Sequence, residues 1–571
     1  MAFHDECMKK VKNLLLCSAL AVALLTLAFK EDLFQVSKNL DVFASLYKEI
    51  NINYVDETNP SDLMKHGIDA MLGSLDPYTE YVPESEIEDY KLKYISTQYG
   101  GIGAGTLTID GKLFINEVSE GHPSHKADIK PGDQIVKING IDATGKERSQ
   151  ISQLLRGPKG TPVNLTLLRE GTVINKSIVR EEIKQPNVSY SGMLDEQIGY
   201  IRLDKFLENS GQEVKEALES INKQKPRGLI LDLRNNGGGI LQEAVKIVNL
   251  FVDRNILVVT QKGRNPEKSV TYKTTANAIA PNLPIVVLIN RTSASASEIV
   301  AGALQDLDRG IVVGQRSYGK GLVQQTFNLP YNSLVKVTVA KYYTPSGRCI
   351  QALDYAHKKQ DGSAEKFADS TLKAYGTKAG RTVYDGNGVF PDVEVEATKY
   401  SPITISLLTK SLFFDYANSF KKANKAVATA KDFQVTEAQY TQFVASLTGK
   451  DYSYTSKSER LLNELKTEAD RENKAVTVKA DLDALKAKII GSKKSDLTNH
   501  KAEIKRALET QIISRYFHEK GKIEQSFQYD KEIAKAKTLF SNQSQMLAIL
   551  KGDGTYKTIG SPILKGDDSQ N

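Results

Sequence analysis

Residues 284–324 alternate short apolar runs with polar turns, and the apolar spacing predicts two strands separated by a helix. The run Pro284–Asn290 is apolar, β-branched and short, which is typical of a buried strand. Gly310 marks the end of the helix, and Ile311–Val313 is predicted to be the second strand. The helical spacing is carried by Ile299, Val300, Ala303, Leu304 and Leu307. A small polar turn therefore lies where a strand ends and a helix begins, and free amides at that point favour negative charge.

Strands and helices continue to alternate through residues 183–400, which is typical of parallel or mixed α/β structure. One predicted strand ends in Gly237, Gly238 and Gly239, and glycines in such a turn leave backbone amides accessible at little steric cost. Residues 351–384 are polar and irregular and are predicted to be an insertion. The predicted elements are the strands Ile198–Phe206, Gly228–Gly239 with its turn, and Val335–Tyr343, and the helices Ser210–Asn222 and Leu241–Val252.

The pattern changes on both sides of this α/β segment. Residues 98–182 are punctuated by glycine and rich in predicted strands, with a helix at Ser149–Leu155. Residues 31–97 are helical by periodicity, and we expect them to form a cap on the core. One apolar face there comprises Val36, Leu40, Phe43, Leu46, Tyr47 and Ile50. From residue 401 the composition favours helices at Val435–Leu447, Glu459–Arg471, Asp481–Ile490 and Ile504–Phe517.

These changes divide the chain of 571 residues into several parts, as its length also suggests. The fold class that we predict is α/β and multidomain. The predicted segments are a signal peptide or membrane anchor (1–30), a helical region (31–97), a strand-rich domain (98–182), an α/β core (183–400) and a C-terminal helical domain (401–571).

The first segment predicts export from the cytoplasm. Lys9, Lys10 and Lys12 precede Asn13–Phe29, an almost uncharged run rich in Leu, Ala and Val. Its 17 residues lie at the lower limit for crossing a bilayer, so a cleaved signal and an inner-membrane anchor are both open. Either alternative predicts a periplasmic or cell-envelope protein.

Charge and cysteine content exclude several other classes. The 76 basic and 69 acidic residues give a net charge of +7, which is small for this length and does not indicate nucleic-acid binding. Of the three cysteines, Cys7 and Cys17 lie in or before the targeting segment, which leaves Cys349. Neither an intramolecular disulfide nor a cysteine metal cluster is therefore expected.

The polar turn after Pro284–Asn290 supports two interpretations. Ser295-x-x-Glu298 fits a capping box, with Ser295 as the N-cap of the helix. The same position suits a nucleophilic hydroxyl, because the oxyanion that it creates needs nearby amides. Downstream, Gly314-x-x-x-x-Gly319-Lys320 imitates a phosphate-binding loop, but Gly321 stands where that motif requires Ser or Thr. A nucleotide site is thereby excluded.

The order of SASASE followed by GKGLVQ resembles the C-terminal processing peptidases, or tail-specific proteases. The resemblance implies a ClpP/crotonase-like core and a serine endopeptidase that works through an acyl-enzyme without a metal or organic cofactor. It assigns the nucleophile to Ser295, the general base to Lys320 and an orienting role to Gln324. It also implies an oxyanion hole made by the backbone of Gly237 or Gly238 together with Ala296.

A lysine can act as this base only when its amine is neutral. Its pKa must then fall from about 10.4 to roughly neutrality, which requires burial and no carboxylate partner. Gln324 can orient the amine by hydrogen bonding without restoring its charge. No histidine lies between His125 and His357, so a His-based triad has no local support.

Ala127–Gly140, with its Lys-Pro-Gly-Asp turn, resembles a PDZ domain. Such domains hold a terminal carboxylate on backbone amides and pair the peptide with a strand edge. The resemblance places Gly101, Ile102, Gly103 and Ala104 in the carboxylate loop. The implied partners are protein or peptide substrates bound by their C-terminus, while the oligomeric state is left open.

Other functions are compatible with parts of this pattern. A tail-binding scaffold or chaperone would need the PDZ-type segment alone, although every expected catalytic position is filled. An acyl-transfer enzyme of the crotonase-like class would need only the α/β core, and the export signal argues against it. A latent protease, with the PDZ domain blocking the cleft until a ligand binds, would use all of these features.

Overall fold

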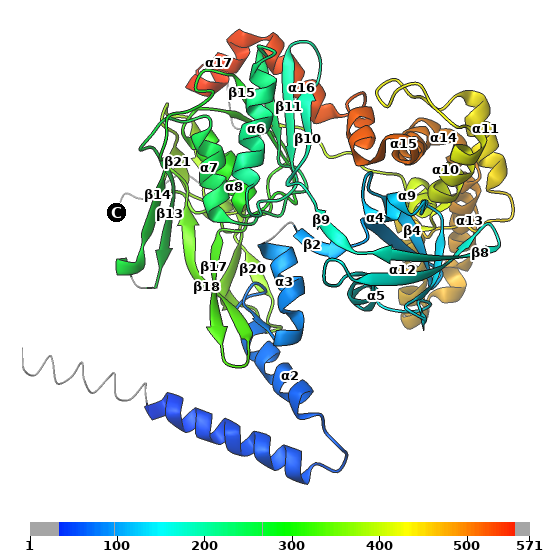
Figure 1. Cartoon of the computed structure of the whole chain (residues 1–571), viewed down its shortest axis with the longest axis horizontal. Helices are drawn as coiled ribbons and strands as arrows, with labels where there is room; N and C mark the ends of the chain where they lie inside the picture. The colour runs from blue at the N-terminus through cyan, green and yellow to red at the C-terminus, as the bar shows by residue number, and fades with distance from the viewer. Residues whose placement is uncertain (1–33, 96–97, 265, 554–571) are drawn as a thin grey trace, which may run out of the picture. The chain divides into compact units, whose positions relative to one another are not determined.

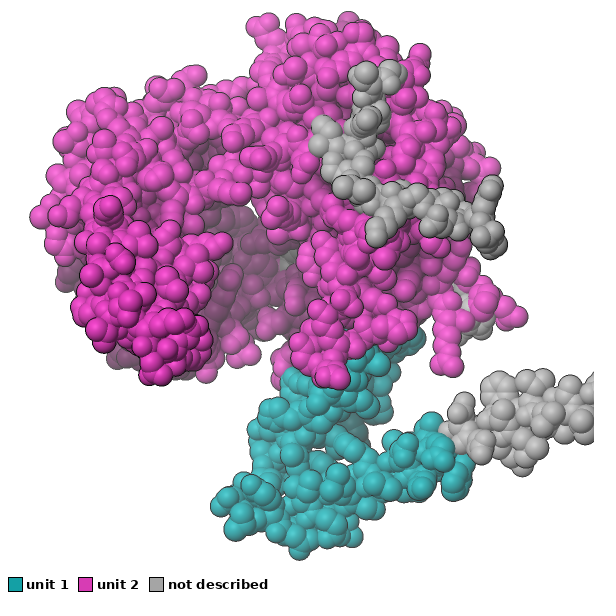
Figure 2. Space-filling model, turned by 180° about the vertical axis from the view of Figure 1, so that it is seen from behind, with its two compact units in different colours: residues 1–82, 326–337 teal, residues 83–325, 338–571 magenta. Residues whose placement is uncertain are grey.

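The computed structural model describes residues 34–95, 98–264 and 266–553. The predicted signal peptide or anchor at 1–30 lies outside them. The described chain forms two compact units, of which the smaller contains the residues up to Val82 together with Thr326–Val337 (Figure 2). The larger contains Pro83–Gln325 and everything from Thr338 onward. Within the described ranges, no helix combines the length and apolar character needed to cross a membrane.

The described part of the smaller unit is built from helices, the strand β1 (Glu80–Val82) and the adjoining ends of β17 (Leu322–Leu329) and β18 (Ser333–Tyr343). A helix runs through residues 34–53 and is followed by α2 (Pro60–Gly73), which begins with an Asn59 cap. The strand β1 pairs antiparallel with the first part of β18. The helical face predicted from the periodicity is exposed rather than buried, since Leu40 is 63% and Leu46 is 55% exposed.

A β-domain occupies the stretch predicted to be strand-rich. Its main sheet has the order β3-β4-β5-β7-β8, with β6 beside β5, and β2 pairs with β9 in a separate ribbon. Ile115, Ile138, Val163 and Leu167 are buried among these strands and α5 (Arg148–Leu155). The strands are β2 (Gln98–Gly101), β3 (Ala104–Ile109), β4 (Lys112–Val118), β5 (Gln134–Ile138), β6 (Ile141–Asp142), β7 (Pro162–Arg169), β8 (Thr172–Val179) and β9 (Glu181–Lys184), with α3 (Ile87–Tyr94) before them and α4 (Pro123–Lys126) among them.

The α/β core is organised around a sheet of order β10-β11-β12-β15-β16-β23, in which all pairs except β10–β11 are parallel (Figure 1). Its central strands are buried on both faces, so they read as continuous apolar runs in the sequence. The strands are β10 (Val188–Met193), β11 (Ile198–Leu203), β12 (Gly228–Asp232), β15 (Ile285–Ile289), β16 (Ile311–Gly314) and β23 (Val393–Glu394). The helices of the first face are α6 (Ser210–Asn222), α7 (Leu241–Asn249) and α8 (Ala296–Asp306).

The opposite face of this sheet is covered by the C-terminal end of the described chain. Ile533, Ala536 and Leu539 of α16 (Lys531–Ser541) and Ile549 of α17 (Gln543–Lys551) are buried against strand residues such as Ile230 and Val286. No individual helix was predicted beyond Phe517, and the contact of this segment with the sheet was not predicted either. The segment after residue 520 therefore completes the α/β core.

Other strands before and after α8 form smaller sheets, and a buried ion pair holds the end of this helix. β13 (Leu257–Gly263) pairs with β14 (Val270–Lys273) and with the second part of β18, which also pairs with β17 (Leu322–Leu329). The stretch predicted to be irregular contains β19 (Leu353–Lys358), β20 (Ala364–Lys366), β21 (Ala374–Gly376) and β22 (Thr382–Tyr384). Arg348 binds Asp306 at 2.8 Å with both side chains fully buried, which anchors the 344–348 turn to the end of α8.

The remaining helices form a bundle with its own core. Phe413, Phe443, Leu508 and Ile512 are buried within it. Three of the predicted helices are observed with longer bounds, because propensity does not locate their ends. The helices are α9 (Pro402–Thr409), α10 (Leu412–Ala423), α11 (Glu437–Ser446), α12 (Lys457–Arg471), α13 (Ala475–Lys493), α14 (Asp496–Asn499) and α15 (Lys501–Ser526).

Candidate active site

Ser295 lies at the junction between the buried strand β15 and helix α8. Its backbone has φ 55° and ψ −114°, a conformation that costs a non-glycine residue free energy and is concentrated at functional sites. Ser295 is also the N-cap of α8, and its N–H donates to Glu298 at 2.8 Å, as the capping box predicts. The two interpretations of this serine are thus compatible, since one residue caps the helix and presents a half-exposed hydroxyl.

Glu298, at the third position of α8, also binds the loop that carries Lys320. Its fully buried carboxylate accepts hydrogen bonds of 2.5 to 2.9 Å from the Ser317 hydroxyl and from the backbone N–H groups of Gly319 and Lys320. Burial raises the pKa of Glu298 to about 6, although these four donors oppose the shift. One carboxylate therefore fixes the backbone of both Ser295 and Lys320.

The loop that carries Lys320 is closely packed. A Cβ atom on Gly319, which has φ +87°, would lie 2.4 Å from Ala352 Cβ, and the N–H of Gly321 donates to Gln351 at 2.7 Å. The buried Tyr342 hydroxyl lies 3.1 Å from the carbonyl oxygen of Ser295 and 2.6 Å from that of Lys320. Lys320 is thus held on a rigid loop whose backbone shares two partners with Ser295.

Gln324 follows on β17 and is half-buried. Its side-chain Nε2 donates to the hydroxyl of Thr338 on β18 at 3.1 Å. The bond fixes this side chain relative to the strand that also carries Tyr342.

The glycine turn after β12 packs directly against Ser295. A Cβ on Gly238, which has φ +92°, would lie 2.7 Å from Ser295 Cβ and 2.8 Å from Ala296 N. The N–H of Gly238 already donates to Asn236 Oδ1 at 2.9 Å. The N–H of the exposed Gly237 has no protein acceptor among the described residues, so Gly237 and Ala296 are the stronger pair of the predicted oxyanion donors.

Asn236 holds this turn in place. Its side chain donates to Leu203 O at 2.7 Å, and its carbonyl accepts from Ala294 N–H at 3.0 Å and from the Ser297 hydroxyl at 2.9 Å. Asn236, Tyr342 and the wider role of Glu298 were not found from the sequence. Of these three residues, only Glu298 was marked by a sequence motif, the capping box.

The predicted carboxylate loop contains a glycine with a left-handed backbone. Gly103 has φ +69°, and a Cβ there would lie 2.4 Å from His122 Cβ, so that only glycine fits. Within the described ranges, the N–H groups of Ile102 and Gly103 have no protein acceptor. Ala104 begins β3, which is the edge strand of its sheet.

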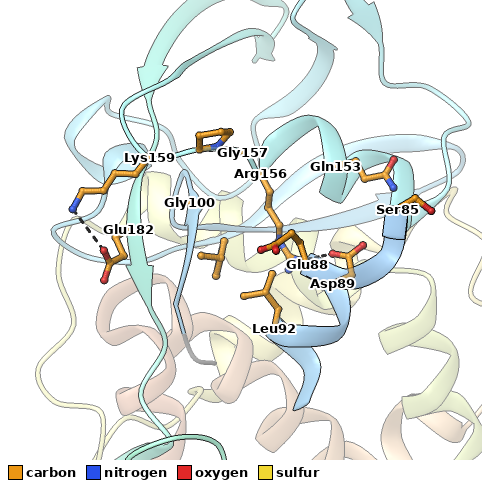
Figure 3. Close-up of a pocket in the computed structure, with 12 residues that line it drawn as sticks. Ser85, Glu88, Asp89, Leu92, Gly100, Gln153, Arg156, Gly157, Lys159 and Glu182 are labelled. Atoms are coloured by element: carbon orange, nitrogen blue, oxygen red, sulfur yellow. Dashed lines mark hydrogen bonds and ion pairs between the residues drawn. The ribbon is translucent and has the colours of Figure 1, made fainter. Parts of the chain in front are cut away.

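A pocket of about 680 Å³ lies beside this loop, between α3 and the turn after α5 (Figure 3). Gly100, Arg156 and Lys159 line it, and Arg156 forms an ion pair of 3.2 Å with Asp89 of α3. The lining includes none of the predicted loop residues 101–104 and none of the predicted catalytic residues.

The thiol of Cys349 is half-buried. Burial raises the pKa of the Cys349 thiol, which disfavours the reactive thiolate. Across the described part of the chain, no group of three or more His, Cys, Asp or Glu side chains is arranged to hold a metal ion.

Comparisons with known proteins match three parts of this architecture. Peptidase family S41 matches residues 197–357, the PDZ domain family matches 114–169, and the family described as "Probable PDZ-protease, C-terminal helical domain" matches 403–540. The "Probable CtpA-like serine protease" of Staphylococcus haemolyticus is 30% identical over 418 residues, which are 73% of this chain and 77% of that protein. The "Carboxy-terminal processing protease CtpA" of Bacillus subtilis is 35% identical over 362 residues, 59% and 77% of the two chains.

Among solved structures, the photosystem II D1 C-terminal processing protease is 26% identical, with a TM-score of 0.34 and coverage of 62% of this chain and 92% of that one. The fold and the site define a serine peptidase of the S41 type with a PDZ domain. The chain belongs to the family of carboxy-terminal processing proteases.

Proposed function

We propose that this chain is an exported endopeptidase in which Ser295 is the nucleophile and Lys320 is the general base. The observation that carries the proposal is the shared anchoring of these two residues. Ser295 has a strained backbone at a strand–helix junction, and both residues donate backbone N–H groups to the one buried carboxylate of Glu298. Preorganisation of this kind is what a nucleophile and its base require.

The chemistry proceeds through an acyl-enzyme. The neutral amine of Lys320 takes the proton of the Ser295 hydroxyl as its oxygen attacks the scissile carbonyl carbon. The N–H groups of Gly237 and Ala296 stabilise the resulting oxyanion. The ammonium group then gives its proton to the departing amine, which leaves the acyl group on Ser295, and water deprotonated by Lys320 releases it. Gln324 orients the amine without adding charge.

Substrate tails are captured by the β-domain. The amides of Ile102 and Gly103 receive the terminal carboxylate, and the peptide pairs with the open edge of β3. Support comes from the absence of protein acceptors for these two amides within the described ranges and from the position of β3 at the sheet edge. Gly101 and Ala104 flank the loop.

Export and self-association belong to the same proposal. The basic residues before Asn13–Phe29 and the apolar character of that run support export, with the segment either removed or retained as an anchor. The exposed apolar face that includes Leu40 and Leu46 supports association with a second copy of the chain.

A fluorophosphonate reagent tests the nucleophile. Intact-mass measurement of the treated protein should show one adduct, and peptide mapping should place it on Ser295. Lys320→Ala should slow the labelling strongly, because the hydroxyl loses its base. Labelling at another serine, or unchanged labelling of the Lys320→Ala protein, would contradict the proposal.

A further inference from the structure

Helix α16 lies on the central sheet, next to the strands that carry the candidate site (Figure 1). Phe540 of α16 packs so closely on β12 that a Cβ at Gly228 would lie 2.3 Å from its ring. Ile533, Ala536 and Leu539 are buried in the same cluster as Ile230. The helix is therefore fixed to the sheet by apolar contacts along its length.

The first turn of α16 also reaches Arg234, at the end of β12. Arg234 Nη2 lies 2.7 Å from the carboxylate of Asp530, the N-cap of α16, and Nη1 lies 3.3 Å from that of Glu532. The same guanidinium binds Asp232 at 2.6 Å. Arg234 thus joins α16 to the segment between β12 and the glycine turn.

Glu532 extends the connection to a second strand. Its other carboxylate oxygen accepts from Gln315 Nε2 at 2.8 Å, and Gln315 follows the end of β16. The N–H of Gln315 donates to Ile289 O of β15 at 3.2 Å. Arg234 leads into the Asn236–Gly238 turn, and Gln315 leads into the loop of Ser317 and Lys320. One carboxylate therefore bridges the segment that leads into the glycine turn and the segment that leads into the Lys320 loop.

The charges of this cluster depend on one another. A single guanidinium, 14% exposed, faces the three carboxylates of Asp232, Asp530 and Glu532. The Tyr200 hydroxyl donates to Asp232 at 2.6 Å, and Arg202 adds positive charge nearby. Burial opposes the ionisation of Asp232, but Arg234 holds its pKa below the usual value. Removing one member of such a buried network leaves its partners uncompensated.

We propose that the first turn of α16 is a positioning element of the active site, in which Glu532 and Asp530 keep the glycine turn and the Lys320 loop in register. The inference rests on the proposed roles of Ser295, Lys320 and the glycine turn. Glu532 contacts no substrate in this scheme and acts through Arg234 and Gln315. The C-terminal segment is then required for turnover and not for capture of the substrate tail.

The test is kcat per active site of the full-length chain, with sites counted by fluorophosphonate titration. Glu532→Ala should lower this value by about 10- to 100-fold, because small misplacements of catalytic groups have effects of that size. Glu532→Gln, which keeps the bond to Gln315, should recover part of the loss. Binding of a fluorescent tail peptide should not change.

Lys537→Gln is the matched control, since Lys537 lies on the same helix and pairs with Asp195 at 2.8 Å, near the start of β11. It should leave kcat per titrated site unchanged. A purely structural role of Glu532 would lower the number of titratable sites but not kcat per site, and that outcome would overturn the inference. Equal losses in the Lys537→Gln control would also overturn it.

If Glu532→Ala fails to fold, kcat per titrated site is measured in Gln315→Leu instead. This variant removes the hydrogen bond to Glu532 without changing a charge. A normal kcat per site in this variant would contradict the bridge. Failure of the proposed function is recognised separately, because titration would then not label Ser295 at all.

Discussion

Two glycine turns in this chain share a backbone feature but pack against different residues. Gly238 in the core and Gly103 in the β-domain both have positive φ, at 92° and 69°, and neither has room for a Cβ. Gly238 packs against Ser295 and Ala296, whereas Gly103 packs against His122. In the proposed function, one closely packed glycine turn stabilises a charge that develops during the reaction, and the other binds a carboxylate that is already present.

The largest expected effect comes from removing the reacting groups beside the core turn. Ser295→Ala and Lys320→Ala should each lower cleavage of an unfolded test protein by at least about 10⁴-fold, because these residues act as a unit. Both proteins should keep the wild-type thermal midpoint and the wild-type affinity for a tail peptide. Substantial cleavage by either variant would contradict the proposed roles of Ser295 and Lys320, and with them the proposed role of the core turn.

Gly238→Ala tests the core turn itself. The added Cβ displaces the turn from Ser295 and Ala296, and loss of one oxyanion donor costs about 10²- to 10³-fold in kcat. KM for a tail-bearing substrate should not change. The control is Gly380→Ala, because Gly380 also has φ +92° but has open space where the Cβ would lie. If both variants lost activity equally, backbone strain rather than position would explain the effect.

Gly103→Ala should have the opposite kinetic signature. The new Cβ would collide with His122 and move the two amides that receive the carboxylate. Charge-assisted hydrogen bonds of this kind are worth about 1.5–3 kcal/mol, so tail affinity should fall by roughly 10- to 100-fold while kcat is preserved. Fluorescence anisotropy with a tail peptide measures this directly. Gly145→Ala, with φ +70° and open space, should bind normally.

The smallest effect concerns Glu298, the buried carboxylate that accepts from the backbone N–H groups of Ser295 and Lys320. The pKa of Glu298 in the folded protein is raised to about 6. Protonated Glu298 therefore adds to the free energy of unfolding below pH 4.5, and this stabilisation is lost as the pH rises through 6. The shift corresponds to about 2 kcal/mol at most. Urea unfolding of Ser295→Ala, with and without Glu298→Gln, should reveal this difference between pH 4.5 and 7.

Activity should move in the other direction over the same range. Only the ionised carboxylate accepts hydrogen bonds from all four donors, so cleavage should fall as Glu298 becomes protonated. If the protein with Glu298 became more stable relative to the Glu298→Gln protein as the pH rises, the raised pKa of Glu298 would be contradicted.

Local patterns were sufficient to predict the junction at Ser295, its cap by Glu298 and the glycine turn, because each depends on neighbouring residues. The contacts of Glu298 with Gly319 and Lys320 could not be predicted, since they join segments far apart in the chain. Tyr342 was predicted only as part of a strand, without the contacts of its hydroxyl. Proximity in the fold, rather than residue type, gives these side chains their roles.

The same limit applies to the architecture. α16 lies in the segment whose composition favours helices, but a helix pattern does not specify which surface covers it. The short strands between 351 and 384 are polar and were predicted to be irregular, because their pairing depends on neighbours and not on an apolar core. The PDZ domain, with its glycine turns and alternating strands, was predicted more closely.

The position of α16 and α17 also has a consequence for the order in which the protein matures. A ribosome delivers the serine, the lysine and the glycine turn long before it delivers Ile533 and Ile549, which close the second face of their sheet. A nascent chain therefore carries every proposed catalytic residue before the sheet that supports them is covered on both faces. A chain that ends before residue 523 should accordingly fail to react with fluorophosphonate, because the second face of the sheet is then left uncovered.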